Sequence, residues 1–136
     1  MTQTQLNKDA VLHAFDMWTE GRGDIRALFA RDLTWQIVGE SAAAGDYTRD
    51  GIVTLMDDID RHFTRHGAVK PIRVRLAVAE GDWVIVVWDG TGLTDAGASY
   101  NNTYAWCMRL ENGLIVDVVA FYDSIAFDRM WAVTAS

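Results

Sequence analysis

The sequence predicts an α+β fold, in which helices pack on one face of a curved, antiparallel β-sheet. Two observations carry this prediction. Apolar residues recur at helical spacing through most of the first half of the chain, to about residue 63. From residue 72 onward, apolar and polar residues alternate in runs that tight turns separate. Helical segments followed by a meander of strands are typical of an α+β domain.

The first half of the chain is predicted to begin with two helices and a strand. The first helix covers residues 6–18 and ends at the glycines that follow it. A short second helix covers residues 25–29, after a capping aspartate. Alternation over residues 33–37 predicts a strand, and residues 39–45 are expected to form a loop.

A third helix is predicted to lead into the meander. It covers residues 52–63, and Thr48 or Asp50 is expected to cap its first turn. The strands of the meander are predicted over residues 72–78, 83–89, 100–110 and 114–122. A short helix follows them, with Asp123 or Ser124 as its cap.

Composition and charge exclude several classes of protein. The chain of 136 residues is half hydrophobic, which predicts one folded domain over residues 1–136 and excludes disorder. With 12 basic and 19 acidic residues the net charge is -7, so we expect no nucleic-acid partner. The longest apolar run, Trp83 to Trp88, is too short to span a bilayer, and no secretory leader is recognisable. We therefore expect a cytoplasmic protein with no membrane partner.

Several short motifs, in order along nearly the whole chain, carry a resemblance to a known family. They are Ala27–Asp32, Trp35, Gly45–Tyr47 with Gly51, Tyr100–Tyr104, Glu111–Ile115 and Tyr122–Asp123. In this order they resemble the nuclear-transport-factor-two-like superfamily, and most of all its SnoaL-like, ketosteroid-isomerase-related branch. The resemblance implies a cystatin-like α+β cone with an apolar cavity, often assembled as a homodimer through the outer face of the sheet. The superfamily includes enzymes and non-enzymes, so the fold leaves the activity open.

The resemblance and the strand alternation together nominate the residues that would hold a ligand. The candidate ligand-binding residues are Trp18, Trp35, Tyr47, Met56, Trp88, Asn102, Trp106 and Tyr122. Two interpretations stay open. The tryptophans could form an aromatic cage around a small-molecule ligand, or they could fill the cavity as an ordinary core.

The positions that carry catalysis in related enzymes hold other residues in this chain. The resemblance implies that the base of ketosteroid isomerase falls near Ile37 and its oxyanion aspartate at Trp106. It also implies that the aspartate of limonene epoxide hydrolase and of the SnoaL-like polyketide cyclases falls at Ala120. None of these side chains can transfer a proton at neutral pH. The function is therefore expected to be that of a small-molecule pocket protein, with cofactor-free isomerase, cyclase or dehydratase chemistry as one version. The alternative is a non-catalytic ligand-binding or dimerisation module.

If the protein is an enzyme, the candidate catalytic residues are His13, Tyr104 and Asp123. His13 lies on the first predicted helix, where an imidazole beside the cavity could exchange a proton. The alternative for His13 is an exposed helix residue, and the alternative for Asp123 is a helix cap.

Neither a metal nor a cofactor is expected. His62 and His66 are four residues apart on a predicted helix, a spacing that can bind a metal. The chain supplies no third ligand at a matching spacing, so two exposed histidines are the favoured interpretation. By strand alternation, Asp89 and Asp117 should lie on the sheet face opposite the cavity.

Overall fold

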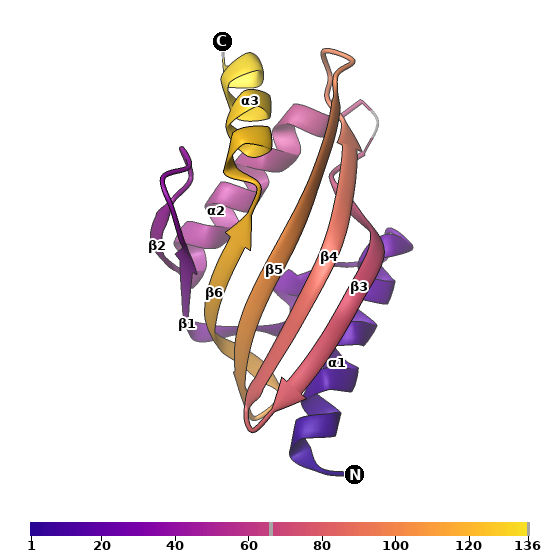
Figure 1. The fold of residues 1–136 in the computed structure, drawn as a ribbon, viewed down its shortest axis with the longest axis vertical. Coiled ribbons are helices and arrows are strands. Elements are labelled where there is room, and N and C mark those ends of the chain that lie inside the picture. Colours follow the sequence, from indigo (N-terminus) through magenta and orange to yellow (C-terminus); the bar gives the residue numbers. More distant parts are fainter. Residues whose placement is uncertain (66, 136) are drawn as a thin grey trace.

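Figure 1 shows the fold in a computed structural model, which describes residues 1–65 and 67–135. The helices are α1 (Gln3–Thr19), α2 (Arg49–Asp60) and α3 (Ser124–Ala135), with short 3₁₀ helices η1 (Ile25–Leu28) and η2 (Arg61–Phe63). The strands are β1 (Phe29–Ile37), β2 (Gly45–Thr48), β3 (Lys70–Glu80), β4 (Trp83–Leu93), β5 (Ser99–Glu111) and β6 (Leu114–Tyr122). No helix of the described residues is long and apolar enough to cross a membrane.

The strands form one sheet in the order β2-β1-β6-β5-β4-β3. Strands β3 to β6 pair as antiparallel neighbours, so the predicted meander is confirmed. Strand β1 departs from the antiparallel prediction, because it pairs parallel to β6. Parallel neighbours need a long connection, and nearly the whole middle of the chain connects these two strands.

The long strands curve around the helices, which cover one face of the sheet (Figure 1). Helix α1 packs on β3 and β4, helix α2 packs on β1 and β2, and helix α3 contacts β5. This arrangement confirms the predicted α+β architecture and leaves the inner face of the sheet opposite α1 and α2.

Side-chain caps explain where the first two α-helices begin. The hydroxyl of Thr2 accepts a hydrogen bond from the backbone N–H of Gln5 at the start of α1. Thr48 does the same for the N–H of Gly51, which decides between the two predicted caps of α2. Each cap satisfies an N–H that has no partner within its own helix.

The segment around η1 and β2 differs from the prediction. The second helix is only a 3₁₀ turn, and Phe29 already begins β1. The predicted loop after β1 ends at Gly45, where the short strand β2 pairs with β1 through Ile37. A four-residue strand shows too little alternation to be recognised in a sequence.

The inner face of the sheet is apolar and buried, as the alternation predicts. On β4 the inward residues Val84, Val86 and Trp88 are buried, and Trp106 and Met108 lie beside them on β5. The residues between them point to the outer face. This alternation sets which side chains can reach a site beneath the helices.

Candidate functional site

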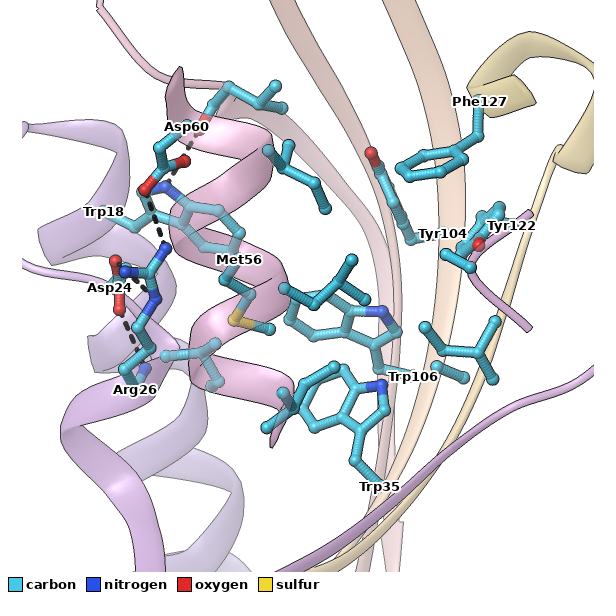
Figure 2. A pocket seen from close by; sticks show the side chains of 18 of the residues that line it. Trp18, Asp24, Arg26, Trp35, Met56, Asp60, Tyr104, Trp106, Tyr122 and Phe127 are labelled. Carbon is cyan, nitrogen blue, oxygen red and sulfur yellow. Dashed lines mark hydrogen bonds and ion pairs between the residues drawn. The ribbon is translucent and has the colours of Figure 1, made fainter. Parts of the chain in front are cut away.

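A cavity of about 90 Å³ lies between the inner face of the sheet and the helices (Figure 2). Its wall includes, among the residues that the sequence nominates, Trp18, Trp35, Met56, Trp88, Tyr104, Trp106 and Tyr122. They come from α1, β1, α2, β4, β5 and β6, so the cavity exists only in the folded chain. A buried water needs roughly 10–15 Å³ on a comparable measure, so this space suits several waters or a small organic molecule.

The wall of the cavity is a cluster of interlocked aromatic rings centred on Trp106. The ring centroids of Trp35 and Trp106 are 5.0 Å apart, and those of Trp88 and Trp106 are 4.9 Å apart, both in T-shaped arrangements. Trp18 packs against Trp88 at 5.0 Å. Such edge-to-face packing holds the rings in defined orientations.

Two of these indole rings keep their N–H groups unpaired. Trp18 donates its N–H to the carbonyl of Val69 at 3.1 Å. The N–H groups of Trp35 and Trp88 are buried and have no hydrogen-bond partner among the described residues. A buried donor without an acceptor costs about 1–3 kcal/mol. The aromatic wall therefore carries a cost in folding stability that a fully hydrogen-bonded core would avoid.

A hydrogen-bonded chain supports the hydroxyl of Tyr104. The hydroxyls of Tyr100 and Tyr104 are 2.8 Å apart, and the Asn102 amide N–H donates to Tyr100 at 2.8 Å. The same Asn102 amide joins β5 to the backbone N–H and carbonyl of Asp123. Burial raises the pKa of Tyr100 to about 12 and the pKa of Tyr104 well above its ordinary value. Both phenols therefore stay protonated at neutral pH.

A second chain of hydrogen bonds leads from Tyr122 out of the cavity. The Tyr122 hydroxyl lies 2.9 Å from the hydroxyl of Ser41, and Ser41 donates to the carboxylate of Asp128 at 2.8 Å. The same carboxylate oxygen accepts the backbone N–H of Ala42 at 2.9 Å. Burial raises the pKa of Tyr122 as well. Ser41 and Asp128 were not nominated from the sequence, because a loop serine and a helix aspartate carry no pattern that joins them.

Charged groups occupy one side of the cavity, where η1 meets α2. Arg26 donates to Asp57 and Asp60, each at 2.8 Å. Its Nε lies 3.6 Å from Asp24, and Figure 2 shows Arg26 with Asp24 and Asp60. Desolvation lowers the pKa of Arg26, but the hydrogen bond to Asp60 and the three carboxylates outweigh it, so the pKa is raised. One guanidinium thus faces three carboxylates, which leaves an excess of negative charge beside the cavity. Sequence reasoning missed this cluster, since Asp57 and Asp60 lie more than 30 residues from Arg26 along the chain.

The structure places several nominated residues outside the cavity wall. The expectation that His13 lines the cavity is wrong, because its side chain is exposed. Its neighbours Ala14 and Phe15 are buried, and one helical step turns His13 away from them. Tyr47 donates its hydroxyl to the carbonyl of Ala43 at 2.6 Å, and Tyr47 and Asn102 are absent from the wall.

Asp123 caps α3, as the alternative for this residue predicts. Its carboxylate accepts the backbone N–H of Ala126 at 3.1 Å, and its carbonyl accepts the N–H of Phe127. The side chain is exposed and is absent from the cavity wall. A helix-capping role therefore accounts for an aspartate at this position.

The histidine pair is only partly described. His62 packs edge-on against Trp131 with ring centroids 5.2 Å apart, and His66 lies outside the described residues. Over the described part of the chain, no group of three or more His, Cys, Asp or Glu side chains could hold a metal ion.

Asp89 and Asp117 lie on the outer face of the sheet, as the alternation predicts. The Thr103 hydroxyl and then the Arg75 guanidinium lower the pKa of Asp89 to about 2. The Thr34 hydroxyl, followed by Arg109, lowers the pKa of Asp117. Both carboxylates are held by outer-face partners, so neither is available to the cavity.

Comparisons with known proteins show the same fold. Among solved structures, Bal32a from a soil-derived mobile gene cassette is 20% identical, with a TM-score of 0.77 over 96% of this chain and 99% of that one. An NTF2-like protein from Burkholderia xenovorans LB400 is 21% identical, with a TM-score of 0.69 over 96% and 98%. TerC, co-crystallised with polyporic acid, is 16% identical, with a TM-score of 0.71 over 96% and 98%.

Sequence comparison identifies the family. No curated protein matches the chain. The profile of the SnoaL-like domain, however, matches residues 9–118. This range covers strands β1 to β5 and the first part of β6. The chain belongs to the family of SnoaL-like domains.

Proposed function

We propose that the protein binds a small, planar and largely apolar molecule in the cavity beneath α1 and α2. The observation that carries this proposal is an aromatic wall with hydroxyl groups at one side. Trp35, Trp88 and Trp106 supply apolar ring surface, while Tyr104 and Tyr122 supply polar atoms in the same cavity. An apolar cavity with a few convergent polar groups is the usual form of a small-molecule site.

The charges beside the cavity select against anionic ligands. Arg26, the cation in the cavity wall, already has close ion pairs with Asp57 and Asp60. A ligand carboxylate or phosphate would have to displace these partners and would approach uncompensated negative charge. We therefore expect the ligand to be uncharged.

One structural neighbour supports small-molecule binding by this fold, although its ligand is an acid and so does not bear on the expected charge. TerC was co-crystallised with polyporic acid, an organic small molecule, although it shares only 16% identity with this chain. The neighbour supports the idea that this fold accommodates small organic molecules. The aromatic wall supports the same kind of binding in this chain. Binding without chemistry is favoured, because the cavity wall holds Ile37, Trp106 and Ala120 at the positions of the family's catalytic residues. None of these three side chains can transfer a proton. The catalytic alternative is cofactor-free isomerisation, cyclisation or dehydration.

Native mass spectrometry of freshly purified protein, followed by denaturation, is the first test. We expect a co-purified small molecule, or, for protein that arrives empty, saturable binding of the hydrocarbon probe 4-ethyltoluene. The variant Ala120→Leu fills the cavity and should abolish binding, with Ile37→Phe as a second cavity-filling variant. Ala98→Leu, at an exposed loop position, is the matched control and should bind normally. Protein that carries no co-purified molecule and also fails to bind the probe would contradict the proposal.

We further propose that two copies pair through the outer face of the sheet. This face exposes Leu76, Val78 and Phe121, with exposed fractions of 49%, 51% and 44%. Exposed apolar surface of this kind is typical of a protein interface, and a two-fold axis lets one face pair with itself. We also propose that residues 1–136 form one SnoaL-like domain and that the protein is cytoplasmic.

Analytical ultracentrifugation tests the proposed dimer. We expect a dimer at micromolar concentration. We expect a monomer for Val78→Glu, which places a charge among the exposed apolar residues of the outer sheet face. Ile125→Glu is the control, because Ile125 is 64% exposed on α3, away from the sheet face. A wild-type protein that sediments only as a monomer of 15.2 kDa would contradict this assembly.

A further inference from the structure

Tyr104 and Tyr122 face each other across neighbouring strands at the polar side of the cavity (Figure 2). Their ring centroids are 5.9 Å apart, and both rings line the cavity. In isolation the two phenols are equivalent groups, since each can donate and accept a hydrogen bond. Their hydrogen-bond partners outside the cavity make them different.

We propose that Tyr104 acts as a hydrogen-bond donor and Tyr122 as an acceptor toward the cavity, and that the pair selects a ligand with a hydroxyl group on a planar ring. This inference rests on the proposed function and adds the chemical class of the ligand. Each assignment follows from counting hydrogens along a chain of neighbours.

The acceptor role of Tyr122 follows from Ser41 and Asp128. A carboxylate can only accept, so the single hydrogen of the Ser41 hydroxyl points to Asp128 at 2.8 Å. The Ser41 oxygen must then accept in its 2.9 Å contact with Tyr122. Tyr122 therefore donates its own hydrogen to the Ser41 oxygen. Only the lone pairs of its oxygen remain for a group in the cavity.

The donor role of Tyr104 follows from Asn102 and Tyr100. The Asn102 carbonyl oxygen accepts the backbone N–H of Asp123 at 2.9 Å, which fixes the orientation of the amide. The amide nitrogen therefore faces Tyr100, and it can only donate to that hydroxyl. Among the described partners of Tyr100, Tyr104 is the acceptor that remains for the Tyr100 hydrogen. Tyr104 thus accepts from Tyr100 and keeps its own hydrogen free for the cavity.

The opposite arrangement would leave a buried hydrogen without an acceptor. If Tyr104 donated to Tyr100, the Tyr100 oxygen would accept twice, and its own hydrogen would have no described partner. Tyr100 is only 3% exposed, so water does not readily supply one. The assigned arrangement leaves the Tyr104 hydrogen without a described partner instead, but Tyr104 lines the cavity, where a ligand or water can accept it, and Tyr100 does not. Because buried donors are rarely left unpaired, donation from Tyr100 to Tyr104 is favoured.

A ring hydroxyl matches this pair in hydrogen-bonding type, because its oxygen carries both a hydrogen and lone pairs. It donates its hydrogen to Tyr122 and accepts the hydrogen of Tyr104, while the ring packs among the tryptophans. An ether can satisfy only Tyr104, and a hydrocarbon satisfies neither tyrosine. Ligand discrimination therefore reports the two hydrogen-bond directions separately.

The test is a titration with three matched probes of one ring: 4-ethylphenol, 4-ethylanisole and 4-ethyltoluene. The indole N–H signals of the 6 tryptophans in ¹⁵N-labelled protein report occupancy of the cavity. For each variant we take the ratio of the dissociation constants of two probes. The hydration of the free probes is the same for every variant, so it cancels when these ratios are compared. The phenol-to-ether preference reports Tyr122, and the ether-to-hydrocarbon preference reports Tyr104.

Removing Ser41 is the decisive change. In Ser41→Ala the hydrogen of Tyr122 is released, so Tyr122 can donate into the cavity and the preference for phenol over ether should fall about tenfold. Tyr122→Phe should lose the same preference because the acceptor is gone. Asp128→Asn should keep it, since an amide oxygen can still accept from Ser41 and Ala42. Ser99→Ala, at an exposed position, is the control.

Tyr104→Phe should lower the preference for ether over hydrocarbon about tenfold and leave hydrocarbon binding intact. The proposal is overturned if Ser41→Ala keeps the phenol preference of the wild type within twofold, or if Asp128→Asn loses it to the same extent as Ser41→Ala. Hydrocarbon binding with unchanged ratios in every variant would overturn this inference while the proposed function stands. If none of the three probes binds and the protein also carries no co-purified molecule, the proposed function itself fails.

Discussion

The rings of Trp88 and Tyr104 stack with their centroids 4.1 Å apart and their planes inclined by 12°. The two residues are register partners on β4 and β5, so the stack forms across the sheet and joins the aromatic wall to the polar side of the cavity. Gly90 lies next to this stack on the inner face of β4. The position of both rings therefore depends on the missing side chain of Gly90.

Gly90→Ala should disturb the cavity. A Cβ at this position would lie 2.8 Å from a ring carbon of Trp88 and 3.2 Å from one of Tyr104. We expect a loss of about 1–3 kcal/mol in the free energy of unfolding, measured with urea, together with weakened probe binding.

Gly92→Ala is the matched control for this change. Its Cβ would lie 2.9 Å from the ring of Phe63, which is not part of the cavity wall. Both Cβ atoms would also lie 3.2–3.3 Å from Val69, so that contact is common to the two variants and only their ring contacts differ. This variant should lose a similar free energy of unfolding but keep probe affinity. Equal effects of the two variants on binding would contradict the role assigned to the stack.

Asp89 should make the folded protein more sensitive to acid. The pKa of Asp89 is about 2 in the folded protein, against an ordinary value of 3.8, because Thr103, Arg75 and Arg73 donate to its carboxylate. Between these values the unfolded chain binds more protons, so stability rises with pH. The contribution of Asp89 is complete above about pH 4 and is lost as the pH falls through 2.

Urea unfolding between pH 2 and pH 5 measures this contribution. Asp89→Asn should be less stable than the wild type at pH 5, and the difference should shrink as the pH falls. Asp46→Asn is the control, because Asp46 is exposed and has no ion pair among the described residues. This variant should follow the wild-type curve. A difference between wild type and Asp89→Asn that does not change with pH would contradict the assignment.

Asn102→Ala should destabilise the junction between β5 and α3. The buried Asn102 amide binds the hydroxyl of Tyr100 and both backbone groups of Asp123. Leaving these groups unpaired should lower the free energy of unfolding by about 2–3 kcal/mol. Asn101→Ala, on the exposed side of the same strand, should change it by less than about 0.5 kcal/mol in the same assay.

Asp123→Ala should weaken α3 by removing its cap. The loss of the bond to the N–H of Ala126 should cost about 1 kcal/mol in the free energy of unfolding. Asp123→Asn should restore most of this loss, since asparagine caps helices as well as aspartate does. If the alanine variant were as stable as the wild type, the capping role would be wrong.

The sequence by itself determined the repetitive parts of the structure. Alternation along β4 and β5 predicted that Trp88 and Trp106 face inward and that Asp89 faces outward. These patterns are readable because the repeat of a strand or a helix acts on every residue of the element. The short motifs along the chain likewise predicted the family, and with it the curved α+β architecture.

Only the tertiary structure decided which groups meet at the cavity. Ser41 and Asp128 contact each other from a loop and a helix, and Arg26 joins carboxylates from another element. The exposure of His13, the parallel pairing of β1 with β6, and the hydroxyl contacts of Tyr104 with Tyr100 and of Tyr122 with Ser41 also became visible only there. Contacts between distant segments depend on how the elements pack in three dimensions, and no local repeat in the sequence records that packing.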